Sequence, residues 1–370
     1  MKKATLKQIA EMAGVSTTTV HRALNGKGGC SRDVEEFICR IAQEQGYSTN
    51  QAAAALRKQP LQIAIIFPFR DNGGRFYIDK ILDGYLEYRR ELRDYNIVFQ
   101  EFLLRSSDNK WVDYLDMEYP ELERVLHQIY MEQPVRYDGV IIYGFSITRR
   151  AEALLNRIIG RGTKVVVMER RLPSLEDTCT VMADAEVGGN MAAEMLSKAI
   201  RNSGTVAVIT QNVPGGDHCG DTCIRALQDE RPDLHAVRLE LIMNVDKGEE
   251  IARFLQEQEN LVGVYITCGR HTKSTLDALE ILGRKDLVVL GSELFAETYE
   301  ALQNKVLSSV LDKRPQKIGY MALHLLLMAL GKKRPMPEVY SIPPRIILRA
   351  NSDLYHVNRE YQHALDAYSD

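Results

Sequence analysis

The sequence lacks the features that mark membrane, secreted and disulfide-stabilised proteins. No apolar run approaches the ~18 residues that a membrane span requires. Lys2 and Lys3 are not followed by an apolar segment, so we expect no signal peptide. Six cysteines in 370 residues, without a secretory signal, are expected to be reduced thiols. These absences predict a cytoplasmic protein. With 45% hydrophobic residues, the chain can form two or three domains with cores of their own.

The sequence also lacks the motifs of the common enzyme classes. It contains no Walker A, G-x-S-x-G or H-E-x-x-H pattern, and Gly215-Gly216 lacks the glycine spacing of a dinucleotide site. His127, His324 and His356 are isolated in the sequence and are expected to be surface or core residues. We therefore predict that the protein is not an enzyme and carries no cofactor.

One group of cysteines leaves an alternative open. Cys219 and Cys223 are four residues apart, a spacing that places both on one face if they lie on a helix, and His218 precedes them. A metal or thiol-redox sensor could use such groups. Cys268 or His271 would have to come from another strand end to complete a metal site. We favour small buried or cleft-lining thiols and no metal, with sensing as the alternative.

Charge is distributed unevenly along the chain. The net charge is -3, but residues 1 to 60 contain nine Lys/Arg against five Asp/Glu, and the remainder therefore carries -7. A basic N-terminal segment on an acidic body directs nucleic acid to one end of a protein. The modest overall charge is therefore compatible with DNA binding.

The basic segment begins with two short helices within residues 5–25. Thr5 and Gln8 have the spacing of a capping box, Gly14 can end the first helix, and Ser16 can cap the second. The second helix contains no acidic residue, and its outward row is Thr17, Thr18, His21, Arg22 and Asn25. Such side chains read base edges and phosphates. The alternative is an ordinary surface hairpin of helices.

A third helix and an alanine-rich segment follow. The third helix begins at Ser31 and ends at Gly46, which gives a minimal three-helix core. Residues 51–58 have good helix propensity but are too few to be stable alone. We expect this segment to order only against a partner.

These features closely resemble the LacI family of bacterial transcriptional repressors. The resemblance lies in AGVSTTTVHRALNG, in Gly46-Tyr47, and in Asn50 through Leu56-Arg57. It implies an all-α helix-turn-helix headpiece over residues 1–46, and a hinge helix and linker over residues 47–60. The hinge would fold on DNA, pair with its dimer mate and insert Leu56 into the minor groove. His21 stands where the family usually has serine. This difference affects which operator sequence is recognised, and not how the headpiece binds DNA.

The resemblance also assigns DNA contacts to residues of this chain. Base contacts are implied for Thr17, Thr18, His21 and Arg22; phosphate contacts for Ser16, Thr19, Asn25 and Ser31; and hinge contacts for Asn50, Ala53 and Leu56.

From residue 61 onward, apolar runs of strand length alternate with segments of helical pattern. The expected strands are 63–67, 97–99, 139–142, 165–168, 206–209, 237–242, 262–267 and 287–290, and the expected helices are 76–93, 122–130, 151–159, 188–200, 222–229, 249–256 and 274–282. This alternation predicts an α/β fold with doubly wound parallel sheets that bind ligands at the carboxyl ends of strands. So many strands exceed one sheet, so we expect two lobes with a cleft between them.

This part is similar to the effector domain of the LacI family, which is of the periplasmic-binding-protein type. The resemblance rests on five motifs: Phe76-Tyr77 to Gly84, Tyr137 to Ile142, Glu169-Arg170, Gly291-Ser-Glu293 and Pro315 to Gly319. It implies a two-lobed effector-binding and dimerisation domain over residues 61–350, followed by a tail over 351–370. It also implies that the chain crosses between lobes near 168–172, 291–295 and 329–335. Residues 106–120 read as an insertion whose aromatics pack locally, with a lid or a dimer contact as the alternative.

The resemblance places ten residues around the effector. They are Arg75, Phe76, Tyr77, Tyr143, Glu169, Arg170, Cys219, Cys268, Glu293 and Lys313. Lys313 stands where the family has glutamine, and a buried, unpaired cation is costly. Lys313 should therefore pair with Glu293 or Asp312, or else meet an anionic ligand. We favour a carbohydrate-derived effector with a carboxylate or phosphate, held by Arg170 and Lys313.

The sequence thus predicts a homodimeric repressor of transcription that binds double-stranded operator DNA, responds to a small-molecule effector and has no membrane partner. A small-molecule binding protein without regulatory DNA function is the alternative from another class. It would require residues 1 to 58 to be inert.

Overall fold

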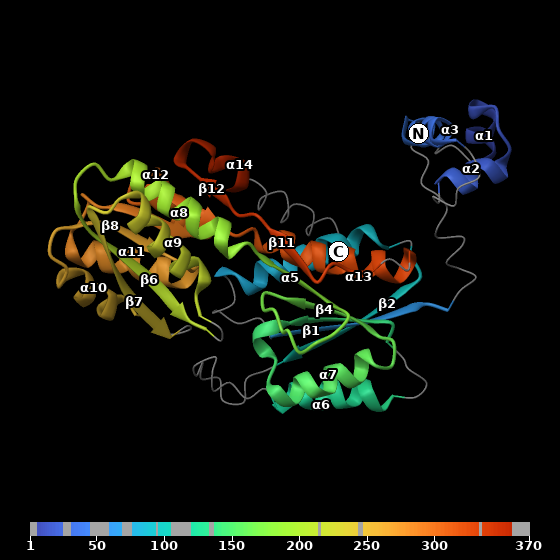
Figure 1. Cartoon of the computed structure of the whole chain (residues 1–370), viewed down its shortest axis with the longest axis horizontal. Helices are drawn as coiled ribbons and strands as arrows, with labels where there is room; N and C mark the ends of the chain where they lie inside the picture. The colour runs from blue at the N-terminus through green and yellow to red at the C-terminus, as the bar shows by residue number, and fades with distance from the viewer. Residues whose placement is uncertain are drawn as a thin grey trace, which may run out of the picture. The chain divides into compact units, whose positions relative to one another are not determined.

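The computed structural model describes residues 6–24, 31–44, 59–68, 76–93, 95–104, 120–132, 137–213, 216–242, 247–332 and 335–356 (Figure 1). The chain divides into two compact units. One contains three N-terminal helices, and the other contains both β-sheets. Within the described residues, no helix is both long and apolar enough to cross a membrane.

The N-terminal unit consists of α1 (Leu6–Ala13), α2 (Thr17–Leu24) and α3 (Arg32–Glu44). Gly14 ends α1 with φ of 66°, in the left-handed conformation that glycine adopts without strain. The Oγ of Ser16 accepts a hydrogen bond of 3.1 Å from the backbone N–H of Thr19, which caps α2. The three helices share one small apolar core, whose buried members are Ile9, Ala10, Val20, Ala23 and Ile38.

The first sheet of the large unit has six strands in the order β11-β5-β4-β3-β1-β2. Its strands are β1 (Leu61–Pro68), β2 (Ile97–Leu104), β3 (Gly139–Tyr143), β4 (Lys164–Met168), β5 (Thr178–Ala183) and β11 (Val339–Ile342). Its helices are α5 (Ile78–Glu91), α6 (Pro120–Met131), α7 (Arg149–Ile159) and α13 (Pro315–Lys332). We call this sheet and its helices the first lobe.

Alternate residues of each strand in the first lobe pack against different helices. Val140 and Ile142 of β3 belong to a core cluster that contains leucines of α6 and α7. Ile141 points to the opposite face, which α5 and α13 cover (Figure 1). Because helices cover both faces of the sheet at its centre, β1, β3 and β4 contain uninterrupted apolar runs.

The second sheet also has six strands, in the order β12-β10-β9-β8-β6-β7. Its strands are β6 (Gly204–Asn212), β7 (Leu234–Ile242), β8 (Leu261–Ile266), β9 (Val288–Ser292), β10 (Ser309–Asp312) and β12 (Arg345–Ile347), the last antiparallel to β10. Its helices are α8 (Ala185–Ala199), α9 (His218–Glu230), α10 (Gly248–Gln256), α11 (Gly269–Leu282) and α12 (Ala296–Gln303). We call this sheet and its helices the second lobe.

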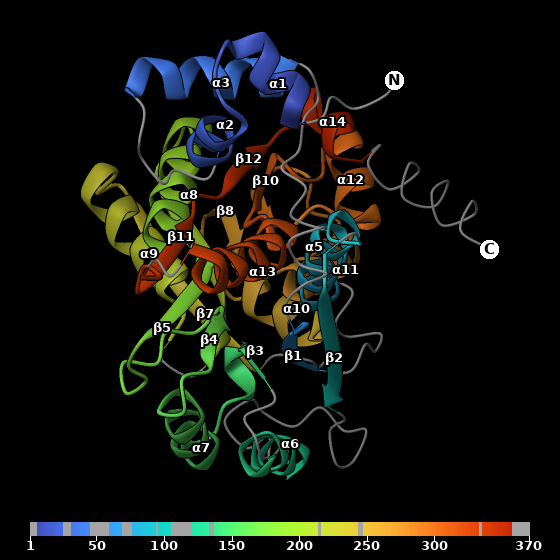
Figure 2. The same cartoon turned by 90° about the vertical axis from the view of Figure 1, so that its right-hand side faces the viewer.

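In the second lobe, too, alternate residues of a strand pack into different core clusters on the two faces of the sheet. Val206 and Val208 of β6 pack with α8 and α9, whereas Ala207 and Ile209 pack with α10, α11 and α12. Figure 2 shows α8 and α9 on one side of this sheet and α10 and α11 on the other. The expected two-lobed α/β architecture is therefore confirmed.

The chain crosses between lobes one strand later than the resemblance implied. β5 still belongs to the first sheet, so the first crossing follows residue 183 and not 168–172. β9 and β10 both belong to the second sheet, so the second crossing follows Asp312 and not 291–295. The third lies at Pro343-Pro344 between β11 and β12, and not at 329–335. All three positions were wrong because β5, β10 and β11 were not among the expected strands.

Close helix packing in the first lobe depends on two glycines. A Cβ added to Gly84 of α5 would lie 1.8 Å from the carbonyl oxygen of Gln316, and one added to Gly319 of α13 would lie 1.8 Å from that of Ile81. The backbones of α5 and α13 therefore touch, which fixes the start of α5 at the edge of the site described below.

The described start of the expected tail belongs to the second lobe. Residues 349–351 form a 3-10 turn and α14 (Asp353–His356) follows. Ser352 is buried, and the hydroxyl of Tyr299 donates to Asp353 over 2.8 Å. Of the insertion expected at 106–120, residues 106–119 lie outside the described residues and Pro120 begins α6, and residues 357–370 also lie outside them.

Candidate functional site

The exposed side of α2 carries several of the residues expected to contact DNA. Thr17, Thr18 and Arg22 are exposed, and Thr19 is half-buried. Ser16 and Ser31 are exposed residues that cap α2 and α3. The side chain of His21 and all of Asn25, Asn50, Ala53 and Leu56 lie outside what the structure describes.

A cavity of about 290 Å³ lies between the two lobes of the large unit. This volume is near the lower end of the ~300–1,000 Å³ range of small-molecule sites. Residues that follow β3, β4 and β5 line it from the first lobe, and residues that follow β6 and β10 line it from the second. Its charged and polar lining consists of Glu169, Arg170, Arg171, Asp184, Gln211, Asp217, His218 and Lys313, and Phe145, Met182, Val213, Cys219, Leu311 and Pro344 contribute apolar or thiol surface.

Glu169 follows β4 directly and has φ of 70°, a left-handed conformation that costs a non-glycine residue free energy. The hydroxyl of Tyr77 donates to Glu169 Oε2 over 2.9 Å. Glu169 Oε1 is buried and has no hydrogen-bond partner among the residues that the structure describes. Burial raises the pKa of Glu169 to about 7, although the Tyr77 hydrogen bond and the Lys313 cation act in the opposite direction.

Glu293 occupies the corresponding position in the second lobe. It follows β9 directly, has φ of 64°, and its N–H donates to Leu311 of the next strand, as that of Glu169 donates to Val181. Within the described part of the chain, neither carboxyl oxygen of Glu293 has a hydrogen-bond partner. Burial and then the nearby Asp312 raise its pKa well above the ordinary value, against the opposing effects of Lys313 and Lys80.

Lys313 follows β10 and acts electrostatically on both of these carboxyls. Its Nζ donates to the carbonyl oxygen of Thr267 over 2.6 Å and lies 5.7 Å from the centroid of the Tyr77 ring. Burial alone would lower its pKa, but Glu293, and then Cys219 and Asp217, raise the pKa above its ordinary value. Lys313 thus stays charged in a position that contacts both lobes.

Further contacts join the lobes beside the cavity. Lys80 of α5 is buried, and its Nζ donates to the carbonyl oxygen of Leu294 in the second lobe over 2.5 Å. The rings of Phe76 and Phe295 lie 4.9 Å apart, edge to face, and the Arg270 guanidinium is 5.6 Å from the Phe76 ring. Phe76 and Tyr77 therefore lie at the junction of the lobes and not in the lining of the cavity.

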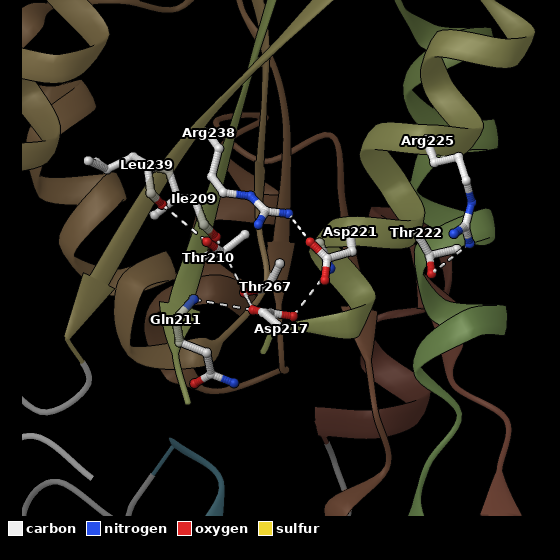
Figure 3. A network of polar contacts seen from close by, with 11 residues as sticks. Ile209, Thr210, Gln211, Asp217, Asp221, Thr222, Arg225, Arg238, Leu239 and Thr267 are labelled. Atoms are coloured by element: carbon white, nitrogen blue, oxygen red, sulfur yellow. Dashed lines mark hydrogen bonds and ion pairs between the residues drawn. The ribbon is translucent and has the colours of Figure 1, made fainter. Parts of the chain in front are cut away.

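Asp217 organises the second-lobe side of the cavity (Figure 3). Its carboxylate accepts from the N–H of Gly220 at the start of α9, from the N–H of Gln211 over 3.2 Å, and from the hydroxyl of Thr267. One acidic side chain thus ties the ends of β6 and β8 to the first turn of α9, where a negative charge is favourable. Asp217 was not among the residues expected around the effector. Its place directly before the helix was the signal for a cap.

The four cysteines that the structure describes in the large unit, Cys179, Cys219, Cys223 and Cys268, are buried thiols. Cys219 lines the cavity, and its Sγ is 3.1 Å from the hydroxyl of Tyr265. Burial raises the pKa of Cys219, and raises that of Cys268 to about 11. Among the described residues there is no group of three or more His, Cys, Asp and Glu that could hold a metal ion.

Only some of the ten residues expected around the effector line the cavity. Four line the cavity: Glu169, Arg170, Cys219 and Lys313. Phe76, Tyr77 and Glu293 lie at the lobe junction, and Tyr143 and Cys268 are buried at the ends of β3 and β8, whereas Arg75 lies outside the described residues. Phe145, Gln211, Asp217 and His218 line the cavity and were not expected there.

Comparison with known proteins identifies both parts of the chain. The family model for bacterial regulatory proteins of the lacI family matches residues 5–50. The family model for a periplasmic binding protein domain matches residues 128–334, more than half of the chain.

Individual relatives agree with these matches. The chain is 40% identical to the ribitol operon repressor of Klebsiella aerogenes over 95 residues, which is 25% of this chain and only 34% of that protein. It is 25% identical to the HTH-type transcriptional regulator RegA of Clostridium saccharobutylicum over 362 residues, covering 94% of this chain and 98% of that protein.

A solved structure shares the fold of the large unit. The solute-binding protein of an ABC transporter from Burkholderia graminis C4D1M, in complex with D-arabinose, superposes with a TM-score of 0.66 at 16% identity and covers 80% of this chain and 98% of its own. The matching regulators are not enzymes, in line with the missing catalytic motifs. The chain belongs to the lacI family of bacterial regulatory proteins and joins a DNA-binding headpiece to a periplasmic binding protein domain.

Proposed function

We propose that the protein is a homodimeric repressor that binds a pseudo-palindromic operator and is controlled by a carbohydrate-derived effector in the cavity between its lobes. The observation that carries this proposal is the presence, in one chain, of a lacI-type headpiece and of a two-lobed domain with a cavity lined by residues from both lobes. Its site on chromosomal DNA would place the protein in the cytoplasm.

The headpiece would read the operator through α2. Thr17, Thr18 and Arg22 are exposed side chains on a helix that contains no acidic residue. A guanidinium can bind both acceptors of a guanine edge, and hydroxyls can bind bases or phosphates. One headpiece contributes few base contacts, so specific binding would require two headpieces and the paired hinge segments, with Leu56 in the minor groove.

A carbohydrate-derived effector fits the cavity in size and chemistry. The ribitol operon repressor is a relative and a fold neighbour binds D-arabinose, which favours a ligand of this class. Hydroxyl groups need both donors and acceptors, which Arg170, Glu169 and Asp217 supply from two sides. Arg170 donates to the carbonyl oxygen of Ile147 over 3.2 Å and, within the described residues, has further N–H groups that could bind a carboxylate or phosphate of the effector.

Control of DNA binding would follow from linkage between effector and lobe arrangement. An effector that binds the closed lobes better than the separated lobes shifts the population toward closure. It can change operator affinity only by its differential affinity for these two states.

A thermal-shift screen over pentoses, hexoses, sugar alcohols, sugar acids and sugar phosphates tests the effector assignment. A ligand at a hundred times its Kd should stabilise the protein by about 2.7 kcal/mol. The stabilisation should disappear in Ala185→Trp, because Ala185 lines the cavity and an indole would fill it. Stabilisation that survives this substitution would place the ligand elsewhere, and a panel without any stabilising member would reject the effector class.

A further inference from the structure

The junction between the lobes contains two glutamates whose buried carboxyl groups are incompletely hydrogen-bonded. Glu169 comes from the first lobe and Glu293 from the second, each directly after a strand and each with positive φ. Among the described residues, one oxygen of Glu169 and both oxygens of Glu293 are buried without a hydrogen-bond donor. A buried carboxylate without donors costs more free energy than a buried carboxyl.

Charged and titratable groups surround this pair from several elements. Glu169 is faced by Tyr77, directly before α5, and by Lys313, after β10. Glu293 is faced by Lys80 of α5, Asp312 of β10, Lys313 and Tyr77. The other titratable and charged groups nearby are Tyr143 of β3 and, in the cavity lining, Arg170, Arg171, Asp184, Asp217, His218 and Cys219. Asp312 is paired with Arg345, which leaves two lysines beside two glutamates. The local charges are thus close to balance, and burial dominates the titration of both carboxyls.

The burial of both carboxyls depends on the contact between the lobes. Lys313 of the second lobe reaches Tyr77 and Glu169 of the first, and Lys80 of the first reaches Leu294 beside Glu293 of the second. Separation of the lobes would break these contacts and admit water to both glutamates. Their pKa values would then return toward the ordinary 4.5, whereas burial in the joined lobes raises that of Glu169 to about 7.

We propose that closure of the two lobes is coupled to the uptake of protons by Glu169 and Glu293, so that the lobe arrangement responds to pH near neutrality. The protons come from solvent and convert each buried carboxylate into a carboxyl, and Glu169 keeps its hydrogen bond from Tyr77. The joined lobes then bind more protons than separated lobes between about pH 4.5 and pH 7. This rests on the lobe motion in the proposed function and adds that an effector selecting the closed lobes binds more tightly as pH falls.

The size of the effect follows from the change in proton binding. For Glu169 alone, a pKa of about 7 in the joined lobes and 4.5 in separated lobes raises the closed-to-separated ratio about thirtyfold between pH 8.5 and pH 5.5. Protonation of Glu293 acts in the same direction. The proposal is tested by the direction of the pH effect, because it requires that acid increases the closed population.

The distance between the lobes tests this directly and needs no effector. Arg157 of α7 and Arg253 of α10 are exposed and lie outside the cavity lining, one in each lobe. A ketone-bearing amino acid at both positions carries spin labels without changing the cysteines, and pulsed dipolar spectroscopy measures the distance in dimers diluted with unlabelled chain. We expect a population with a different distance to grow as pH rises from 5.5 to 8.5 and to reverse when acid is restored.

Two variants test whether the two glutamates cause the pH-dependent change in distance. Glu169→Gln with Glu293→Gln should keep the acid distance distribution at both pH values, because both side chains stay neutral. His218→Gln is the matched control, since it removes the imidazole that lines the same cavity. It should retain the full response.

Several results would overturn the proposal. They are a distance independent of pH, a separated population that grows in acid, a response that persists in the double variant, and a response lost in His218→Gln. Should the double variant not fold, Glu169→Gln alone is expected to reduce the shift, and an undiminished shift would contradict us. Failure here leaves the proposed effector function intact, and an effector screen without a hit leaves this measurement valid.

Discussion

Replacement of Glu169 by glutamine should stabilise the folded protein at neutral and alkaline pH. Glutamine preserves the shape of the side chain and an oxygen that can accept from Tyr77, but it carries no charge into the lobe junction. The folded-state pKa of about 7 lies above the ordinary value of 4.5. The native state therefore binds more protons than the unfolded state between these values, and stability falls as pH rises through this window. The loss is complete above about pH 7.

The magnitude follows from the size of the pKa shift. A difference of about 2.5 pKa units corresponds to at most about 3.4 kcal/mol of lost stability in the wild type at pH 8. Part of this is recovered if water reaches Glu169 through local opening, so we expect a gain of about 1–3 kcal/mol for Glu169→Gln at pH 8. At pH 4.5 the wild-type side chain is protonated in the folded state, and the gain should nearly vanish.

Urea unfolding of the wild type and the variant at pH 4.5, 6, 7 and 8 measures this difference. Glu186→Gln on α8 is the matched control, because Glu186 is an exposed glutamate. The control should change stability by less than about 0.5 kcal/mol at every pH. A loss of stability in Glu169→Gln at pH 8, or a gain that is the same at pH 4.5, would refute the argument from burial.

Three substitutions test the packing of the first lobe and the DNA contacts. Gly319→Ala should destabilise the protein by about 2 kcal/mol or more in urea unfolding, because its Cβ would lie 1.8 Å from the carbonyl oxygen of Ile81. Gly331→Ala on the same helix is the control and should be neutral or stabilising, because its Cβ would meet no neighbouring atom within 4 Å. Equal effects would contradict the helix contact. Arg22→Ala should cost about 1–3 kcal/mol on the operator and relax preference at one base pair, measured on singly substituted operators. Leu56→Ala should weaken operator binding far more than binding to random DNA, and equal losses would exclude the minor-groove wedge.

Local signals in the sequence were sufficient for the headpiece. Gly14 and Ser16 act within one or two turns of their own helices, and the structure shows the left-handed glycine and the capping hydrogen bond that the sequence predicts. The strongly apolar strands were also found, because a strand covered on both faces needs no polar alternation. These features depend on neighbours in the sequence.

The lobe crossings and the cavity depend on neighbours in space. β5 contains three threonine or cysteine residues among six and β10 has only four residues, so neither stands out as an apolar run. Without them, each crossing was placed one strand early. Lys313 meets Tyr77 and Glu169 only because the two lobes fold against each other. The sequence predicted that Lys313 would need a compensating partner, but not that this partner would come from both lobes.

The proposed control of DNA binding by the cavity can be tested with one titration. A labelled operator selected from random DNA is titrated with the wild type and with Ala185→Trp, with and without the ligand that stabilises the wild type. We expect equal operator affinity for both proteins without ligand, and a ligand-induced change of at least fivefold in the wild type only. An identical change in the filled-cavity variant, or an unchanged operator affinity in a wild type that binds the ligand, would contradict effector control through this cavity.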